Sequence, residues 1–291
     1  MDWLALSLAA ALCSSGEAAA MKKLLDDRTP EEMGLTPLVF ALPLCLAVLA
    51  LARPPLPPAG FWLDTALLMP FSFAGYVLYC QAIRLSPLSL TLPYLSLVPV
   101  FTMLTGRLAL GEIPSPAGGA GVLLLAAGSY VLNLRERAAH GVWGPLLAVF
   151  REPGPRRILA VAALYSVVAV IGKRAAVSAT PLGYLAWLPP VYVACFVLLL
   201  SALGRVRLGN ILARPGRGAA LGLIHFVHLA SGTWAVVMTQ TAYMLAVKRM
   251  DGLFGVLLGR AAFREQDIPA RLAGTGLMLA GAAVIAVWGR G

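Results

Sequence analysis

Charged residues are scarce in this chain of 291 residues, since Asp, Glu, Lys and Arg together make up only 12% of it. A soluble domain has about twice that fraction, which argues against a water-exposed globular fold. Lysine is the rarest cation, and the formal charge of +10 comes mainly from arginine. No basic stripe with interleaved aromatic residues is present, so nucleic-acid binding is not indicated.

Cysteine and histidine are also few. The cysteines are Cys13, Cys45, Cys80 and Cys195. Each lies within an apolar stretch, without CxxC or another metal-ligand spacing. No Ser-His-Asp set, phosphate loop or zinc signature stands out, so we expect neither an enzyme active site nor a cofactor. His225 and His228 share one helix face, where polar packing, a pathway role and metal binding are open; because no third ligand is spaced for a site, we expect no metal.

The sequence is instead rich in hydrophobic residues, at 59%. Ten apolar runs approach the roughly 20 residues that span a bilayer as a helix. They lie at about 3–21, 35–52, 60–83, 87–110, 116–134, 157–177, 181–203, 217–236, 239–262 and 269–288. Clusters of helix breakers such as "REPGPRR" (151–157) separate several of them. We therefore predict an all-α, multi-pass protein of the cell membrane with ten transmembrane helices.

The positions of the cations predict the orientation of these helices. Lys22 and Lys23 follow the first apolar run, whereas a signal peptide has its positive charge before it, so we expect the first helix to be retained. Most of the 23 Lys and Arg residues lie in odd-numbered connections, and only Arg53, Arg107 and Arg290 lie in even-numbered ones or the C-terminal tail. The positive-inside rule then puts both termini outside the cell.

A repeated pattern indicates internal duplication. "LALGEIPSPAGGAGVLLLAAG" (108–128) and "AAFREQDIPARLAGTGLMLAG" (261–281) share an acid, an Ile-Pro and a Gly-x-Gly before an apolar run. Each copy ends a half of five runs, and because five is odd the second half must enter the membrane the other way up, as in transporters with inverted repeats. The predicted units are 1–134 and 157–291. The linker over 135–156 contains "HGVWGPLLAVFREP" (140–153), which is either an interfacial helix or a loop.

Residues 75–128, from "GYVLYCQAIRLSP" to "GVLLLAAG", resemble the EamA domain of the drug/metabolite transporter superfamily. In that domain a helix with a Pro is followed by Gly-Glu and a glycine-rich helix. The matching residues are Pro99, Gly111, Glu112, Gly119 and Gly121. The second half departs from the pattern, with Gly252 near the place of the Pro and Arg264-Glu265 for Gly-Glu. The resemblance implies two inverted five-helix repeats; many ten-helix relatives are described with both termini inside, opposite to the charge pattern here.

The stretch "YMLAVKRMDGLFGVLLGR" (243–260) places Lys248, Arg249 and Asp251 inside the ninth apolar run. A cation at the bilayer centre costs about 2.5–3.5 kcal/mol on insertion scales, so such residues face a wet cavity or a counter-charge. Asp251 is three residues after Lys248 and could pair with it on one helix face, which would leave Arg249 without a local partner. The alternative is an anion site, because Arg offers a planar fork and Lys a mobile point charge to a carboxylate or phosphate.

A second basic pair, Lys173 and Arg174, lies late in the sixth run. These residues either extend to the interface or form the opposite wall of the same pocket. Plastid sugar-phosphate translocators have a Lys-Arg pair in the ninth helix that binds the substrate phosphate and a basic pair in the sixth, and "KR" (248–249) and "GKRAA" (172–176) are similar to them. That resemblance implies a substrate-binding role for the four cations, beside which Tyr243 could pack or hydrogen-bond. Many EamA-type proteins have a Ser where this chain has Asp251, and an acid there should weaken anion binding.

Glu17 is the only acid inside the first run. It is either an interfacial residue, a proton-coupling carboxylate or a counter-ion to Lys248 and Arg249. Burial disfavours the charged form of a carboxyl group and a nearby cation favours it, so cargo occupancy could control a proton at such a site. Small multidrug resistance proteins also use a Glu in their first helix.

Together these patterns predict a secondary transporter of a small organic metabolite, expected to be anionic, that works by alternating access. Its expected partners are the cargo, membrane lipid and a coupling proton. Two alternatives stay open: proton-coupled efflux of cationic or apolar compounds centred on Glu17, and a non-transporting membrane scaffold or enzyme subunit. A transporter needs a wet central cavity, whereas a scaffold can fill that space with side chains.

Overall fold

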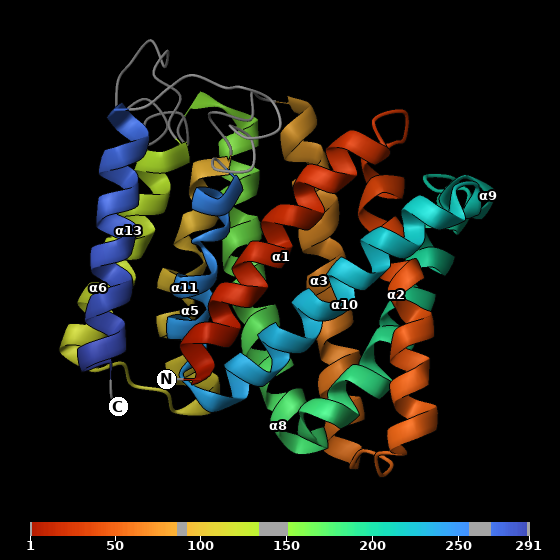
Figure 1. The fold of residues 1–291 in the computed structure, drawn as a ribbon, viewed down its shortest axis with the longest axis horizontal. Helices are drawn as coiled ribbons and strands as arrows, with labels where there is room; N and C mark the ends of the chain where they lie inside the picture. Colours follow the sequence, from red (N-terminus) through yellow and green to blue (C-terminus); the bar gives the residue numbers. More distant parts are fainter. Residues whose placement is uncertain (1, 86–91, 134–150, 256–268, 290–291) are drawn as a thin grey trace.

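The computed structural model describes residues 2–85, 92–133, 151–255 and 269–289, and all regular structure within these ranges is helical (Figure 1). The predicted all-α class is therefore confirmed. The helices of the first half are α1 (Asp2–Leu24), α2 (Pro30–Ala52), α3 (Ala59–Leu85), the 3-10 helix η1 (Leu92–Leu97), α5 (Val98–Leu110) and α6 (Pro116–Asn133). Those of the second half are α8 (Pro153–Ala202), α9 (Leu208–Leu212), α10 (Pro215–Met238), α11 (Thr241–Lys248) and α13 (Pro269–Trp288). Most of the segment 140–153, and Glu265 of the second repeat motif, lie outside the described residues.

Five of these helices are long and apolar enough to cross a membrane: α1, α2, α3 as far as residue 82, α8 and α10. α8 has 50 residues, more than twice the length that one span requires. Thr180 interrupts it with φ 63° and ψ 157°, so the sixth and seventh apolar runs form two arms that meet without a loop. Shorter apolar helices cover Tyr94–Leu110, Pro116–Leu132 and Ala273–Trp288.

Proline and glycine set helix ends as their backbone preferences predict. α2 begins at Pro30 after Thr29, whose Oγ1 accepts a hydrogen bond from the backbone N–H of Glu32 at 3.2 Å. α5 ends at Leu110 and is capped by Gly111, whose φ of 68° is a left-handed conformation that glycine adopts without steric cost. The chain therefore turns sharply just before Glu112, which is important for the site below.

The two chain ends lie close together at one end of the bundle, at the lower edge of Figure 1. The connection between α2 and α3 is at this end as well, whereas the connection between α1 and α2 is at the opposite end. A chain that begins and ends at the same end of the bundle passes along the bundle an even number of times. Lys22, Lys23 and Arg28 thus lie toward the end opposite the termini.

α6 and α13 pack against each other through glycine. A Cβ atom on Gly121 would lie 2.9 Å from the carbonyl oxygen of Gly281, and one on Gly281 would lie 2.7 Å from that of Gly121. Gly128 and Gly274 meet in the same reciprocal way, at 2.7 and 2.8 Å. The two helices are therefore antiparallel and in backbone contact. In the second Gly-x-Gly, which consists of Gly274 and Gly276, only Gly274 makes such a contact, because a Cβ on Gly276 would meet nothing within 4 Å.

Candidate functional site

A cavity of about 400 Å³, the central cavity, lies between α2, α3, both arms of α8, α10 and α11. Its polar lining residues are Ser72, Lys173, Tyr184, Tyr192, His225, His228, Thr233 and Lys248. The other lining residues, including Leu38, Leu188 and Met244, are apolar or glycine. The volume lies in the range of small-molecule sites, and the few polar groups on apolar walls are typical of them.

Lys248 lies where the ninth apolar run stops being a regular helix. α11 ends at Lys248, the chain turns at Arg249 and Met250, and helical backbone resumes at Asp251. The carboxyl end of a helix has a partial negative charge that favours a cation in its last turn. Broken helices near the midplane are also a feature of transporter binding sites.

Lys248 and Asp251 do not form the local salt bridge that their spacing allows. Among the described residues, no carboxylate lies within 4 Å of the Lys248 ammonium group, although Asp251 and Glu17 act on its charge from further away. The side chain of Asp251 instead accepts a hydrogen bond from Ser14 of α1 at 3.3 Å. The turn at Arg249 explains the difference, because residues three apart share a face only on a continuous helix.

Arg249 is directed away from the central cavity. It is absent from the cavity lining, and it lies close enough to Tyr79 of α3 and Tyr165 of α8 to interact with them electrostatically. Its buried Nε atom has no hydrogen-bond partner within the described part of the chain. Lys248 is therefore the member of the ninth-run pair that faces a space in which a ligand fits.

Lys173 and Arg174 are separated in the same way. Arg174 forms an ion pair with Asp64 of α3, donating from Nε at 2.8 Å, and its side chain is 44% exposed. Lys173 lines the central cavity and forms an ion pair with Glu112. It also donates to the carbonyl oxygen of Thr239 at 2.5 Å. Only Lys173 of this pair therefore belongs to the cavity.

A second cavity of about 680 Å³, the terminal cavity, lies at the end of the bundle where both termini are found. Its lining residues include Trp3, Glu112, Gln240 and Gly289, and it shares Lys173 with the central cavity. Glu112 is held there by Thr241 as well, since it accepts hydrogen bonds from the backbone N–H at 2.9 Å and from Oγ1 at 3.1 Å. The Lys173–Glu112 ion pair thus stands at the border between the two cavities.

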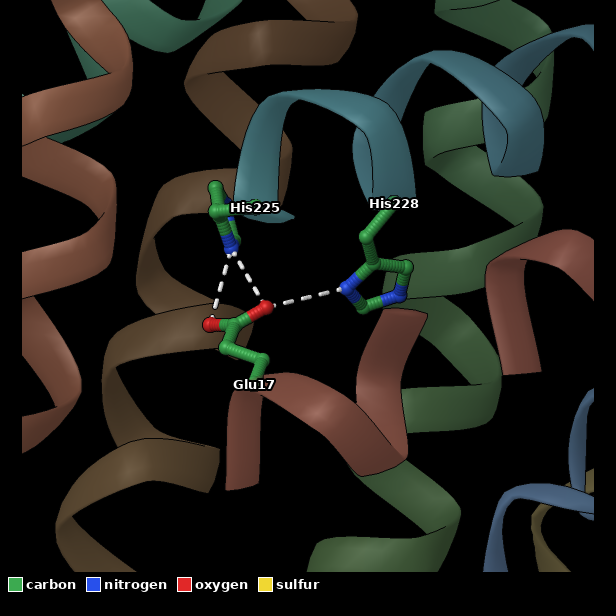
Figure 2. A group of neighbouring side chains, drawn as sticks. All are labelled: Glu17, His225 and His228. Carbon is green, nitrogen blue, oxygen red and sulfur yellow. Dashed lines mark hydrogen bonds and ion pairs between the residues drawn. The ribbon is translucent and has the colours of Figure 1, made fainter. Parts of the chain in front are cut away.

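Glu17 meets the two histidines of α10, as Figure 2 shows. Its carboxylate oxygens lie 3.0 and 3.1 Å from Nδ1 of His225, and Oε2 lies 3.3 Å from Nδ1 of His228. Glu17 is only 8% exposed. The sequence indicated the histidine pair but not this partner, because Glu17 is 208 residues from His225 along the chain.

Tyr243 is part of the protein core. It is 1% exposed, and its hydroxyl accepts a hydrogen bond from the backbone N–H of Ser115 at 3.0 Å. Gly118 leaves room for the ring, because a Cβ atom there would collide with the tyrosine hydroxyl. The described contacts thus show Tyr243 both packing between α11 and α6 and forming a hydrogen bond, but with the backbone and not in the central cavity, whose lining does not include it.

Comparison with known proteins agrees with the fold and the apolar helices. Residues 1–134 match the model of the EamA-like transporter family. No curated protein matches the sequence. Among 28 solved chains that are similar, one described only as "Crystal structure of protein" has 21% identity and a TM-score of 0.72, over 99% of this chain and 97% of its own. That similarity shows a shared fold. Residues 1–134 are thus similar to the EamA-like transporter family, and this match together with the apolar helices indicates a multi-pass membrane protein.

Proposed function

We propose that the protein is a secondary transporter of a small organic anion, bound in the central cavity and moved by alternating access. Lys248 is the observation that supports this most directly. It lines the cavity, and it forms no ion pair with any residue that the structure describes. An enclosed cation without a close counter-charge favours an anionic ligand.

The rest of the lining suggests the character of the cargo. Tyr184 and Tyr192 lie among aliphatic side chains such as Leu188 and Val193. Such walls suit an apolar or aromatic body of limited size, with one carboxylate or phosphate directed to Lys248. A lysine is a mobile point charge, so it recognises an anionic group without the two-point geometry that an arginine imposes.

Alternating access would use the two cavities in turn. The Lys173–Glu112 ion pair borders both, and its rearrangement would join the central cavity to the terminal cavity. The reciprocal contacts of Gly121 with Gly281 and of Gly128 with Gly274 support two halves related by an approximate two-fold axis. In inverted-repeat transporters, movement of one repeat against the other exposes the site to each side in turn. In this proposal ten transmembrane helices, five in each half, lie in the cell membrane.

Uptake into proteoliposomes tests this function. We expect the vesicles to accumulate members of an anion panel of graded size, and we expect Lys248→Ala to abolish this uptake. Lys23→Ala is the control, since Lys23 is an exposed cation at the end of α1, and it should leave uptake unchanged. Lys248→Arg should retain part of the activity because it keeps the charge. Equal transport by wild type and Lys248→Ala would contradict the proposal.

Proton-coupled efflux centred on Glu17 is the alternative within the same family. The same vesicles distinguish it, because a cation panel with an imposed pH gradient would then show transport that depends on Glu17 and not on Lys248. A protein that transports neither class of compound under any gradient would instead fit the scaffold alternative.

A further inference from the structure

Glu17, His225 and His228 form a compact group in which each residue offers one potential ligand atom and these three atoms lie within 4.8 Å of one another. The carboxylate comes from α1, and both histidines come from one face of α10. The imidazole rings stand at 79° to each other with centroids 5.8 Å apart, so both Nδ1 atoms point to the same carboxylate (Figure 2). No other group of at least three His, Cys, Asp or Glu residues within the described ranges has this proximity.

We propose that these three residues bind a divalent first-row transition-metal ion. Imidazole nitrogen and carboxylate oxygen ligate such ions at about 2.0–2.2 Å, which places neighbouring ligand atoms of a tetrahedral site roughly 3.4 Å apart. The Glu17 oxygens already lie 3.0–3.3 Å from the two Nδ1 atoms. Two imidazoles and one carboxylate suit Zn²⁺, Co²⁺ or Ni²⁺, and they disfavour Mg²⁺ and Ca²⁺, which prefer oxygen alone.

Metal binding requires a defined protonation state of the two rings. When Glu17 is ionised, each Nδ1 that faces it donates the ring proton in a hydrogen bond. A metal ligates only an unprotonated nitrogen, so each ring must take the tautomer with its proton on Nε2. That exchange changes no net charge on the protein, and the ion takes the place of the two hydrogen bonds.

The site would open toward the central cavity, because both histidines line it. Three protein ligands leave a fourth tetrahedral position free, as in zinc sites that accept water or a further ligand. Lys248 lines the same cavity and acts on the charge of His228. If the proposed function is correct, an anion could bind the ion and Lys248 together, and by linkage the anion and the metal would each raise the affinity for the other.

The test uses the full-length protein in lipid nanodiscs, with any affinity tag removed. Co²⁺ is titrated and followed by its visible absorption, and Zn²⁺ is titrated against a chromophoric chelator. We expect one ion per chain, with Co²⁺ bands of the intensity that low-coordinate nitrogen and oxygen sites give. His225→Ala, His228→Ala and Glu17→Gln should each weaken Zn²⁺ binding about tenfold or more. Excess Mg²⁺ or Ca²⁺ should not compete.

His140→Ala is the matched control, since it removes the remaining histidine of the sequence and should leave Zn²⁺ affinity unchanged. Lys248→Ala should tighten Zn²⁺ binding in the absence of an anion, because it removes a nearby positive charge. Zn²⁺ should raise the Tm of the wild type and of His140→Ala but not that of His225→Ala, which separates loss of the site from loss of the fold. Absence of saturable binding, or binding that none of the three ligand variants weakens, would overturn the proposal.

The metal site and the proposed anion transport can fail independently. Zn²⁺ binding with no anion uptake would leave the metal site standing and remove its role in cargo recognition. Anion uptake that depends on Lys248, with no Zn²⁺ binding, would support the transport function and contradict the metal site. Anion transport that Zn²⁺ stimulates in the wild type and not in His228→Ala would support both.

Discussion

Lys173 of α8 forms an ion pair with Glu112 of the α5–α6 connection, and the two side chains are only 13% and 12% exposed. Removing one partner of such a pair leaves an uncompensated charge in a mostly buried place, which costs about 3–5 kcal/mol. We therefore expect Glu112→Gln to lower the free energy of unfolding in detergent by an amount near the lower end of that range, because the amide oxygen can still accept from Thr241. Urea or heat unfolding of the purified protein measures this.

The same variant tests whether the ion pair closes the central cavity. In a background in which the four native cysteines are replaced by serine, Thr233→Cys adds a thiol to the cavity lining. An impermeant maleimide added on the side of the termini should label this thiol faster with Glu112→Gln than without it. Unchanged labelling would mean that the barrier between the two cavities lies elsewhere.

Arg174 and Lys173 should differ although they are neighbours in sequence. The Arg174 side chain is 44% exposed and is engaged by Asp64, whereas Lys173 lines the central cavity. We expect Arg174→Gln to leave the KM for the cargo unchanged and Lys173→Gln to change the KM or abolish transport. Equal effects in initial-rate measurements would restore Arg174 to the substrate site.

Backbone contact between α6 and α13 should make Gly121 and Gly281 intolerant of a side chain. Adding one methyl group to a tightly packed place typically costs about 1–3 kcal/mol. Gly121→Ala should therefore lower the unfolding free energy by that amount. Gly276→Ala on α13 is the control, because its Cβ would meet nothing within 4 Å and alanine favours helix. A Gly121→Ala variant as stable as the control would show that α6 and α13 can move apart without a loss of stability.

Thr180 has a backbone conformation that glycine adopts far more readily, with φ 63° and ψ 157°. Such strain costs about 1–3 kcal/mol, and the hydroxyl partly offsets it by accepting from the backbone N–H of Gly183 at 3.3 Å. Thr180→Gly should stabilise the protein modestly, whereas Thr180→Ala keeps the strain, loses the cap and should destabilise it by about 1 kcal/mol. Thermal unfolding of both variants gives the comparison.

Orientation in the membrane is predicted by the charge pattern of the connections. Because most of the 23 cations lie in odd-numbered connections, we expect tags at either terminus to be reached from outside the cell. A reporter that is active only in the cytoplasm should be inactive when fused after Arg290. An active fusion would show that the C-terminus lies in the cytoplasm, which is the opposite orientation.

The helices could be predicted from the sequence because each apolar run is a local signal, bounded by proline, glycine or charge. The partners of the charged residues could not, since they depend on which helices become neighbours. Asp64 and Glu112 lie far from Lys173 and Arg174 in sequence, and Glu17 lies far from His225. A balance of charge was the available clue, because isolated intramembrane cations require acids at similar depth. The turn at Arg249 could not be predicted from the sequence either, and because of it the Lys248 and Arg249 side chains lie in different surroundings.

Charge balance around the central cavity has an electrical consequence. In and beside the cavity, Lys173, Lys248 and Arg249 are matched in number by Glu112, Glu17 and Asp251, so the empty protein would change its access without moving net charge through the membrane field. In a loaded cycle the charge moved is that of the cargo alone. A potential of 100 mV contributes about 2.3 kcal/mol per elementary charge, and in a cell with a negative interior this drives an anion outward. A monovalent anion accompanied by a divalent cation would have a net positive charge and would be drawn inward instead, so the sign of the current across a planar bilayer shows whether the two are transported together.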